Sequence, residues 1–95
     1  MARVRARGAS VPFDLTLEWG DAKWTGRCEL TKFPFELGRT RRGAFSPSID
    51  RIDPTKGYTE DNCRFVLWAV NVFKNNWSTE VMLQIAKALI DHNPQ

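Results

Sequence analysis

Two polar residues stand among apolar neighbours in the stretch from Ser48 to Lys74, and they are the first candidates for chemistry. Asp50 interrupts a strand-like run and Asn71 interrupts an apolar helical turn. A polar side chain that is buried without a partner costs free energy, so each of them needs one. A divalent cation shared by the carboxylate and the amide oxygen would satisfy both. The alternative is a hydrogen-bonded pair with a structural role.

The elements that must position these residues are a strand, a turn, a second strand and a helix. Residues 48–53 alternate weakly and predict the first strand, and Asp-Pro-Thr-Lys-Gly at 53–57 is a strong turn signal. Residues 63–66 predict the second strand, and residues 67–75 carry apolar side chains at helical spacing. The two polar candidates therefore lie on the first strand and on the helix.

The chain before this core predicts one helix and an irregular segment. Apolar residues recur at helical spacing from Leu15 to Trp24, with Asp14 as the N-cap and Gly26 as the stop. Residues 28–31 and 33–37 are short, apolar and interrupted by proline, which predicts small extended pieces or an irregular hairpin.

A last helix is predicted after the core. Ser78 or Thr79 can cap it, and Asn93-Pro94 ends it. It carries a wide apolar face made of Val81, Met82, Ile85, Ala86, Leu89 and Ile90.

Length and composition indicate one soluble globular domain. The chain has 95 residues, of which 42% are hydrophobic and 26% charged. Residues 1–10 are predicted to be a flexible basic arm, and residues 11–95 a single domain. No apolar run reaches the roughly 18 residues of a membrane span, and no secretory signal is recognised. Cys28 and Cys63 do not form a zinc motif, and we expect both to lie reduced in the core.

The net charge of +3 is unevenly distributed. Two arginine clusters carry much of it: Arg3, Arg5 and Arg7, and Arg39, Arg41 and Arg42. Such an excess suits a polyanionic partner, and a solvated surface explains it equally well.

The residues from Ser48 to Lys74 also form an ordered motif. It runs S-I-D-R-I-D, then K-G-Y-T-E-D-N-C-R-F-V, then N-V-F-K. This motif resembles the HNH family of nucleases (ββα-metal or His-Me finger), in a branch common in bacteriophages and bacteria. The resemblance covers residues 46–77. Residues 26–35 also resemble the C-x-x-T-G-x-P-F element that often precedes it, with Lys32 where glycine is usual.

The resemblance implies an α+β fold, with a small ββα-metal core flanked by an N-terminal and a C-terminal helix. It also implies a cytoplasmic protein of a bacterium or a phage-infected cell. Asp50 and Asn71 would hold one Mg²⁺ or Mn²⁺, and Asn62 would brace the loop. The family's general-base histidine follows the metal-binding aspartate, and here that position is Arg51. A guanidinium stays protonated and cannot act as a base, but it can bind the scissile phosphate.

Further contacts with DNA are expected from cations around the motif. Lys74 lies on the helix face of Asn71 and is expected to touch phosphate. The other expected DNA-binding residues are Arg39, Arg41, Arg42 and Lys56. The four tryptophans are predicted to be core residues, with base stacking as the alternative: Trp19, Trp24, Trp68 and Trp77. His92 is expected at the surface, which leaves Tyr58 as a conceivable substitute base.

Two classes of function follow. The first, which the motif favours, is a divalent-metal-dependent endonuclease that nicks or cleaves DNA, with Arg51 and Lys74 on the phosphate. The second is a catalytically impaired module of the same fold that binds DNA or a protein. Arg51 in place of histidine is the main support for the second class. Besides DNA, a second copy of the chain and another protein both remain open as partners.

Overall fold

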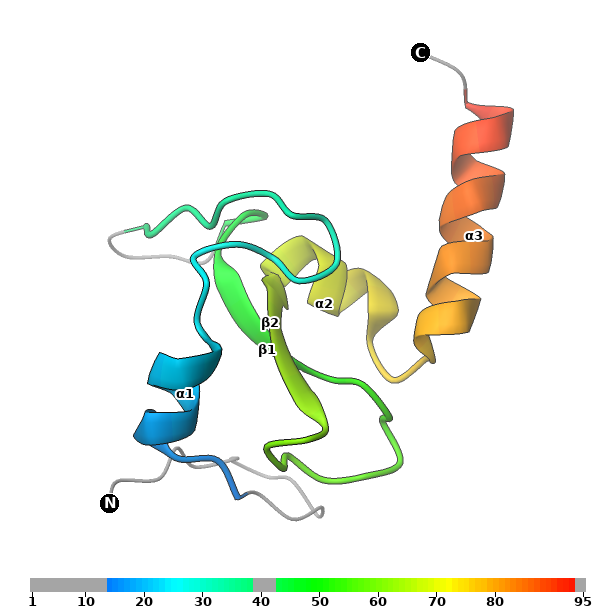
Figure 1. The fold of residues 1–95 in the computed structure, drawn as a ribbon. Coiled ribbons are helices and arrows are strands. Elements are labelled where there is room, and N and C mark those ends of the chain that lie inside the picture. The colour runs from blue at the N-terminus through cyan, green and yellow to red at the C-terminus, as the bar shows by residue number, and fades with distance from the viewer. Residues whose placement is uncertain (1–13, 39–42, 94–95) are drawn as a thin grey trace.

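The computed structural model describes residues 14–38 and 43–93 as an α+β fold with three helices and one two-stranded sheet (Figure 1). Its elements in chain order are α1 (Leu17–Lys23), β1 (Pro47–Arg51), β2 (Cys63–Leu67), α2 (Trp68–Lys74) and α3 (Thr79–His92). The expected fold class is thereby confirmed as α+β. The expected basic arm and the cluster Arg39, Arg41 and Arg42 lie outside the described residues.

The strands β1 and β2 form an antiparallel hairpin whose register places Asp50 opposite Arg64. The two strands and α2 appear where the sequence predicts them, because the turn signals and the change of apolar period bracket each element. Helix α2 begins directly after β2, at Trp68, and packs against both strands. One side of α2 therefore packs against β1.

The first helix begins later than predicted. Thr16, not Asp14, is the N-cap of α1, and its hydroxyl accepts a hydrogen bond from the Trp19 amide at 3.1 Å. The Asp14 amide instead donates to the Tyr58 carbonyl at 2.7 Å, which ties this segment to the loop between the strands. A contact distant in sequence therefore decides where α1 starts.

Two small clusters of buried residues form the core, and β2 contributes to both. Leu15, Trp19 and Cys63 make one cluster, and Cys28, Val66 and Leu67 make the other. Both cysteines are buried free thiols, as expected.

The prediction that all four tryptophans are core residues is wrong. Trp19 is buried, but Trp24 is 38% exposed and Trp77 is 62% exposed. Trp68 is half-buried. A core this small has room for only one of the indoles.

The segment from Arg27 to Pro34 is an irregular hairpin with an isolated β-bridge between those two residues, and the Cys28 amide also donates across it to the Phe33 carbonyl at 2.9 Å. Lys32 has a φ of 67°, in the left-handed region that favours glycine. This is the position at which the element that the segment resembles carries glycine, so the backbone turn is kept although the side chain is not.

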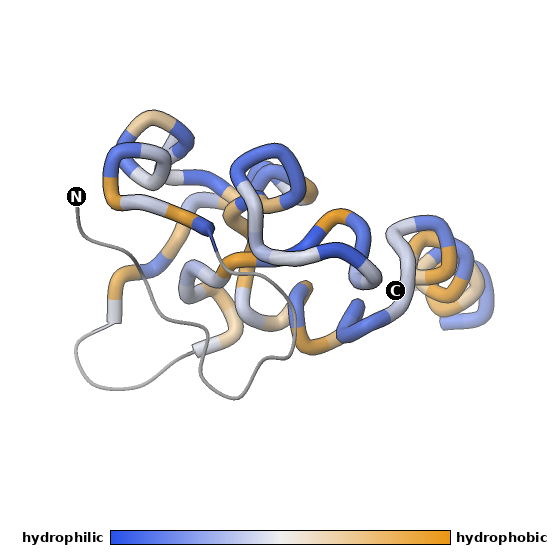
Figure 2. The backbone as a smooth tube through the Cα atoms, turned by 90° about the horizontal axis from the view of Figure 1, so that it is seen from below, coloured by the Kyte–Doolittle hydropathy of each residue, from blue (hydrophilic) through white to orange (hydrophobic). Residues whose placement is uncertain are grey.

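Helix α3 extends away from the sheet and contacts the rest of the fold mainly near its start (Figure 1). The Ser78 hydroxyl caps it by accepting from the Val81 amide at 3.2 Å, and Met82 is its one buried residue. Seen in Figure 2, hydrophobic and hydrophilic residues alternate around its turns. Four of its apolar side chains are exposed: Leu83, Ile85, Leu89 and Ile90. No helix among the described residues is long and apolar enough to cross a membrane.

Candidate functional site

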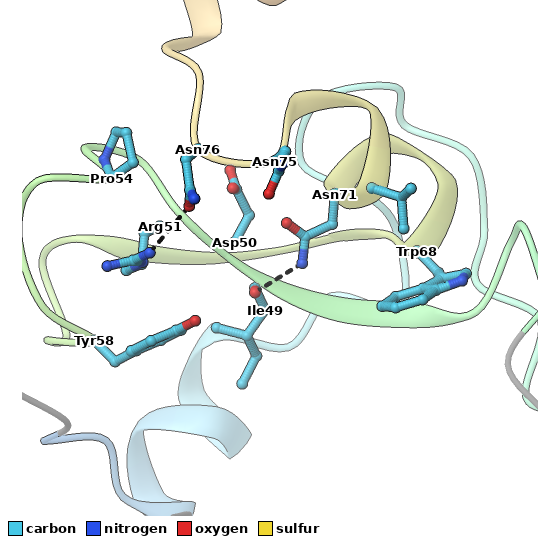
Figure 3. A pocket seen from close by; sticks show the side chains of 10 residues that line it. Ile49, Asp50, Arg51, Pro54, Tyr58, Trp68, Asn71, Asn75 and Asn76 are labelled. Atoms are coloured by element: carbon cyan, nitrogen blue, oxygen red, sulfur yellow. Dashed lines mark hydrogen bonds between the residues drawn. The ribbon is translucent and has the colours of Figure 1, made fainter. Parts of the chain in front are cut away.

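A polar pocket of about 230 Å³ lies between β1, the loop after it and α2 (Figure 3). Asp50 and Arg51 reach it from the end of β1, and Asn71 reaches it from α2. Asn75 and Asn76, which follow α2, close one side. The fold thus brings together most of the residues that the motif singled out.

Asp50 is the most engaged of these residues. Its side chain is 2% exposed. The Lys74 ammonium contacts Oδ1 at 3.1 Å and the Arg64 guanidinium contacts Oδ2 at 2.9 Å. Each carboxylate oxygen therefore already faces a cation, within a site shielded from water, where such a pair interacts strongly.

Lys74 lies inside the fold and not on its surface. Its side chain is fully buried, and its ammonium also donates to the Arg51 carbonyl at 2.8 Å. The residue was expected to touch phosphate, but the structure directs its charge to Asp50 and to the β1 backbone. Lys74 follows Asn71 by about one turn of α2, so both side chains point toward β1. Asn71 contacts Ser48 and Ile49, and Lys74 contacts the next two residues of the strand.

Arg64 was not singled out from the sequence. It lies opposite Asp50 across the hairpin and also donates to the Thr79 hydroxyl at 2.8 Å, at the start of α3. An oppositely charged cross-strand pair is a recognisable signal. It becomes visible only once the register of the two strands is known.

Asn71 fastens α2 to β1. Its amide nitrogen donates to the Ser48 hydroxyl at 2.7 Å and to the Ile49 carbonyl at 3.0 Å. Figure 3 shows this nitrogen turned toward the strand and the amide oxygen turned away from it. The Asn71 amide oxygen can therefore face the pocket that this residue lines.

Arg51 lies at the pocket wall and is partly exposed. Its guanidinium lies over the Tyr58 ring, 4.9 Å from the centroid, and donates to the Lys56 carbonyl at 3.1 Å and to the Asn76 side chain at 3.4 Å. A guanidinium carries five N–H donors, so these contacts orient it without using its whole capacity. The group is suited to binding an anion at the mouth of the pocket.

The loop between the strands is closed by Asn62. Its side chain accepts from the Asp53 amide at 2.9 Å and donates to the carbonyls of Asp53 and Gly57 at 3.0 and 2.8 Å. The side-chain and backbone hydrogen bonds from Thr55 hold the pKa of the Asp53 carboxyl below its ordinary value of 3.8. These hydrogen bonds tie the loop together, and the same loop carries Tyr58 beneath Arg51.

The other candidates lie apart from Asp50. Lys56 is exposed on the same loop, and His92 is exposed in the last turn of α3. Cys63 is buried near the site, and burial raises the pKa of its thiol to about 11, with the Asp50 charge adding to the effect. A pKa in this range keeps the Cys63 thiol protonated at neutral pH.

A divalent cation fits this arrangement poorly. Every buried side-chain nitrogen and oxygen in the described part of the chain already has a hydrogen-bond partner, so Asp50 needs no metal to be satisfied. Residues 14–38 and 43–93 also contain no group of three or more His, Cys, Asp and Glu side chains placed to hold a metal. A cation at Asp50 would lie beside two positive charges that already pair with the carboxylate, and their repulsion disfavours it. The metal site stays a prediction from the resemblance.

Comparisons with protein-family models, curated proteins and solved structures gave no significant match to this chain. The resemblance to HNH nucleases therefore rests on the motif residues themselves. What the site does has to be argued from its geometry.

Proposed function

We propose that this chain is an HNH-like module that binds DNA beside Arg51 and does not hydrolyse it. The observation that carries the proposal is the ion-pair cluster of Asp50, Lys74 and Arg64. Both carboxylate oxygens already face buried cations, where the family's chemistry would need an available metal ligand. The neighbouring side chain is a guanidinium, which cannot take a proton from water.

DNA as the partner is supported by the chemistry around the pocket mouth. The Arg51 guanidinium is oriented by Tyr58 and Asn76 and keeps donors available for a phosphate. Lys56 is exposed on the same loop, and the chain as a whole carries a net charge of +3. Contacts of this kind bind the DNA backbone with little regard to sequence.

A metal-dependent endonuclease is the second candidate. It is favoured by one observation, that Asp50, Arg51 and Asn71 line the same pocket. It requires a metal to share the Asp50 carboxylate with Lys74 and Arg64, which would place three cations around one buried group. The non-cleaving module needs no such crowding of charge.

The deciding experiment combines nicking and binding. We expect supercoiled plasmid to stay intact with the protein in Mg²⁺ or Mn²⁺, as it does in EDTA. We expect a labelled duplex to bind at least as well in EDTA as in Mg²⁺, because Mg²⁺ competes for phosphates, and to bind less well as salt rises. Arg51→Ala should weaken binding, whereas Lys87→Ala, on the exposed face of α3, should not.

Each other outcome is decisive. Nicking in Mg²⁺ or Mn²⁺ that EDTA abolishes, and that folded Asp50→Asn protein lacks, would establish the endonuclease. A failure to bind any duplex at low salt would overturn both DNA functions and leave a protein-interaction module.

A further inference from the structure

We infer that the pocket receives an unpaired nucleotide of a DNA strand, with its base against Trp68 and its phosphate at Arg51. The inference rests on the proposed DNA-binding function and specifies its ligand. It starts from a second pocket of about 450 Å³ that adjoins the polar one. Ile49, Tyr58, Trp68 and Asn71 line both, so the two hollows share a wall.

The second pocket is walled by aromatic rings. Trp24, Tyr58, Phe65 and Trp68 all line it. Trp24 meets Phe65 edge-on, with ring centroids 5.1 Å apart, which fixes one side of the wall. The volume lies within the roughly 300–1,000 Å³ typical of small-molecule pockets. Trp24 also stacks on Phe35 at 5.0 Å and Tyr58 lies under Arg51, so Trp68 is the ring of this wall against which we place a planar heterocycle.

The polar pocket supplies the other half of a nucleotide site. Figure 3 shows Arg51 and Tyr58 on one side of Ile49 and Trp68 on the other. A phosphate at the Arg51 guanidinium would therefore leave its sugar and base directed along the wall toward Trp68. The Asn71 oxygen, turned away from β1, lies between them and can accept a hydrogen bond from an exocyclic amine.

The geometry points to an unpaired base because of what a duplex exposes. Paired bases present their edges in the grooves, and their faces are covered by their neighbours. An aromatic wall binds faces, so a base must leave the stack to reach it, which costs least where the base has no partner. Bulges, mismatches and single-stranded segments are the DNA features that meet this condition.

The test uses the full chain and three labelled duplexes. One is fully paired, one carries a single unpaired adenine, and one carries an abasic residue in place of that adenine. We expect the unpaired adenine to strengthen binding about tenfold over the paired duplex, and the abasic residue to remove that gain. The gain should change little with salt, because stacking neutralises no phosphate.

Matched tryptophan variants assign the effect to the pocket. Trp68→Leu should abolish the preference for the unpaired adenine, and Trp68→Phe should keep most of it because a ring remains. Trp77→Leu removes an indole that is 62% exposed and does not line the pocket, so it should change nothing. Circular dichroism of each variant separates lost binding from lost folding.

The failures are distinguishable. Equal affinity for the three duplexes, with DNA still bound, would overturn the nucleotide pocket and leave the DNA-binding module intact. A preference for the unpaired adenine that survives in folded Trp68→Leu protein would also overturn it. Absence of binding to all three duplexes would overturn the inference together with the proposed function.

Discussion

At the scale of single residues, the buried charges around Asp50 make the stability of this fold depend on a few side chains. A carboxylate with 2% of its side chain exposed is stabilised by two cations, and Lys74 is fully buried beside it. A buried pair of this kind gains little over an apolar core, but breaking it leaves a charge without compensation. The site is therefore sensitive to the loss of any one member.

Replacing Lys74 by methionine should lower the free energy of unfolding by about 3–5 kcal/mol. The reason is that Asp50 would keep its charge with only Arg64 beside it. Urea titration followed by circular dichroism measures the change. A loss of this size is a large share of the roughly 5–15 kcal/mol that holds a small domain together.

Two comparisons interpret that result. The double variant Asp50→Asn with Lys74→Met should lose less than the sum of its single variants, because it removes both charges of one ion pair and leaves only Arg64 without its carboxylate. Lys56→Met, at an exposed position, should stay within about 0.5 kcal/mol of the parent protein. If Lys74→Met were as mild as Lys56→Met, the buried ion pair would contribute nothing to stability.

Lys32 offers a second residue-scale prediction, because its φ of 67° strains any side chain. We expect Lys32→Gly to be more stable than Lys32→Ala by about 1 kcal/mol. Both variants lose the hydrogen bond from the Lys32 ammonium to the Glu29 carbonyl, so their difference isolates the backbone. Equal midpoints of urea unfolding would show that the turn relaxes without glycine.

The sequence predicts the residues of the site better than their contacts. Asp50, Arg51 and Asn71 do meet in one pocket, since a strand and a helix carry them to adjacent positions. The sequence does not single out Arg64, because its pairing with Asp50 depends on the register of β1 and β2. Lys74 is singled out for its charge, but its helical position alone does not reveal that its ammonium turns inward to Asp50.

At the scale of elements, apolar period and turn chemistry account for what is predictable. Both strands, α2 and the Ser78 cap of α3 follow from local signals. The start of α1 does not, because the Asp14 amide is held by the Tyr58 carbonyl, far along the chain. Likewise, Trp24 and Trp77 are exposed because the small core buries few large side chains, and their local sequence does not show this.

Helix α3 should be the least protected of the described elements in hydrogen exchange. It has 14 residues and few tertiary contacts, and helices of that length are marginal on their own. Ser78→Ala removes its cap, at a cost of about 1 kcal/mol, and should speed exchange of its amides roughly fivefold. Ser78→Asp keeps a capping oxygen and serves as the control. Protection equal to that of β2 would mean that a further contact holds α3.

At the scale of the whole molecule, the number of phosphates that its cations contact sets how DNA binding should respond to salt. The logarithm of affinity should fall linearly with the logarithm of salt concentration, with a slope near −0.9 for each phosphate contacted. Arg51→Ala should reduce the magnitude of that slope by about 1, and Lys87→Ala should leave it unchanged. Fluorescence anisotropy over a salt series measures it.

The same series tests the arginine cluster for which the sequence predicts backbone contacts. Replacing Arg39, Arg41 and Arg42 together by alanine should reduce the magnitude of the slope by up to about 3. An unchanged slope with normal folding would show that this cluster does not reach the DNA.

The cluster of Asp50, Lys74 and Arg64 also constrains how this chain can change over generations. A single substitution at any of these three residues leaves a buried charge with one partner fewer. Substitutions that remove two opposite charges together should therefore be tolerated better than single ones. Substituting histidine for Arg51 changes the neighbouring side chain, but the Asp50 carboxylate stays paired with Lys74 and Arg64. Any change that lowers the positive charge around Asp50 therefore calls for coordinated substitutions in the core, whereas the exposed residues around the pocket can change one at a time.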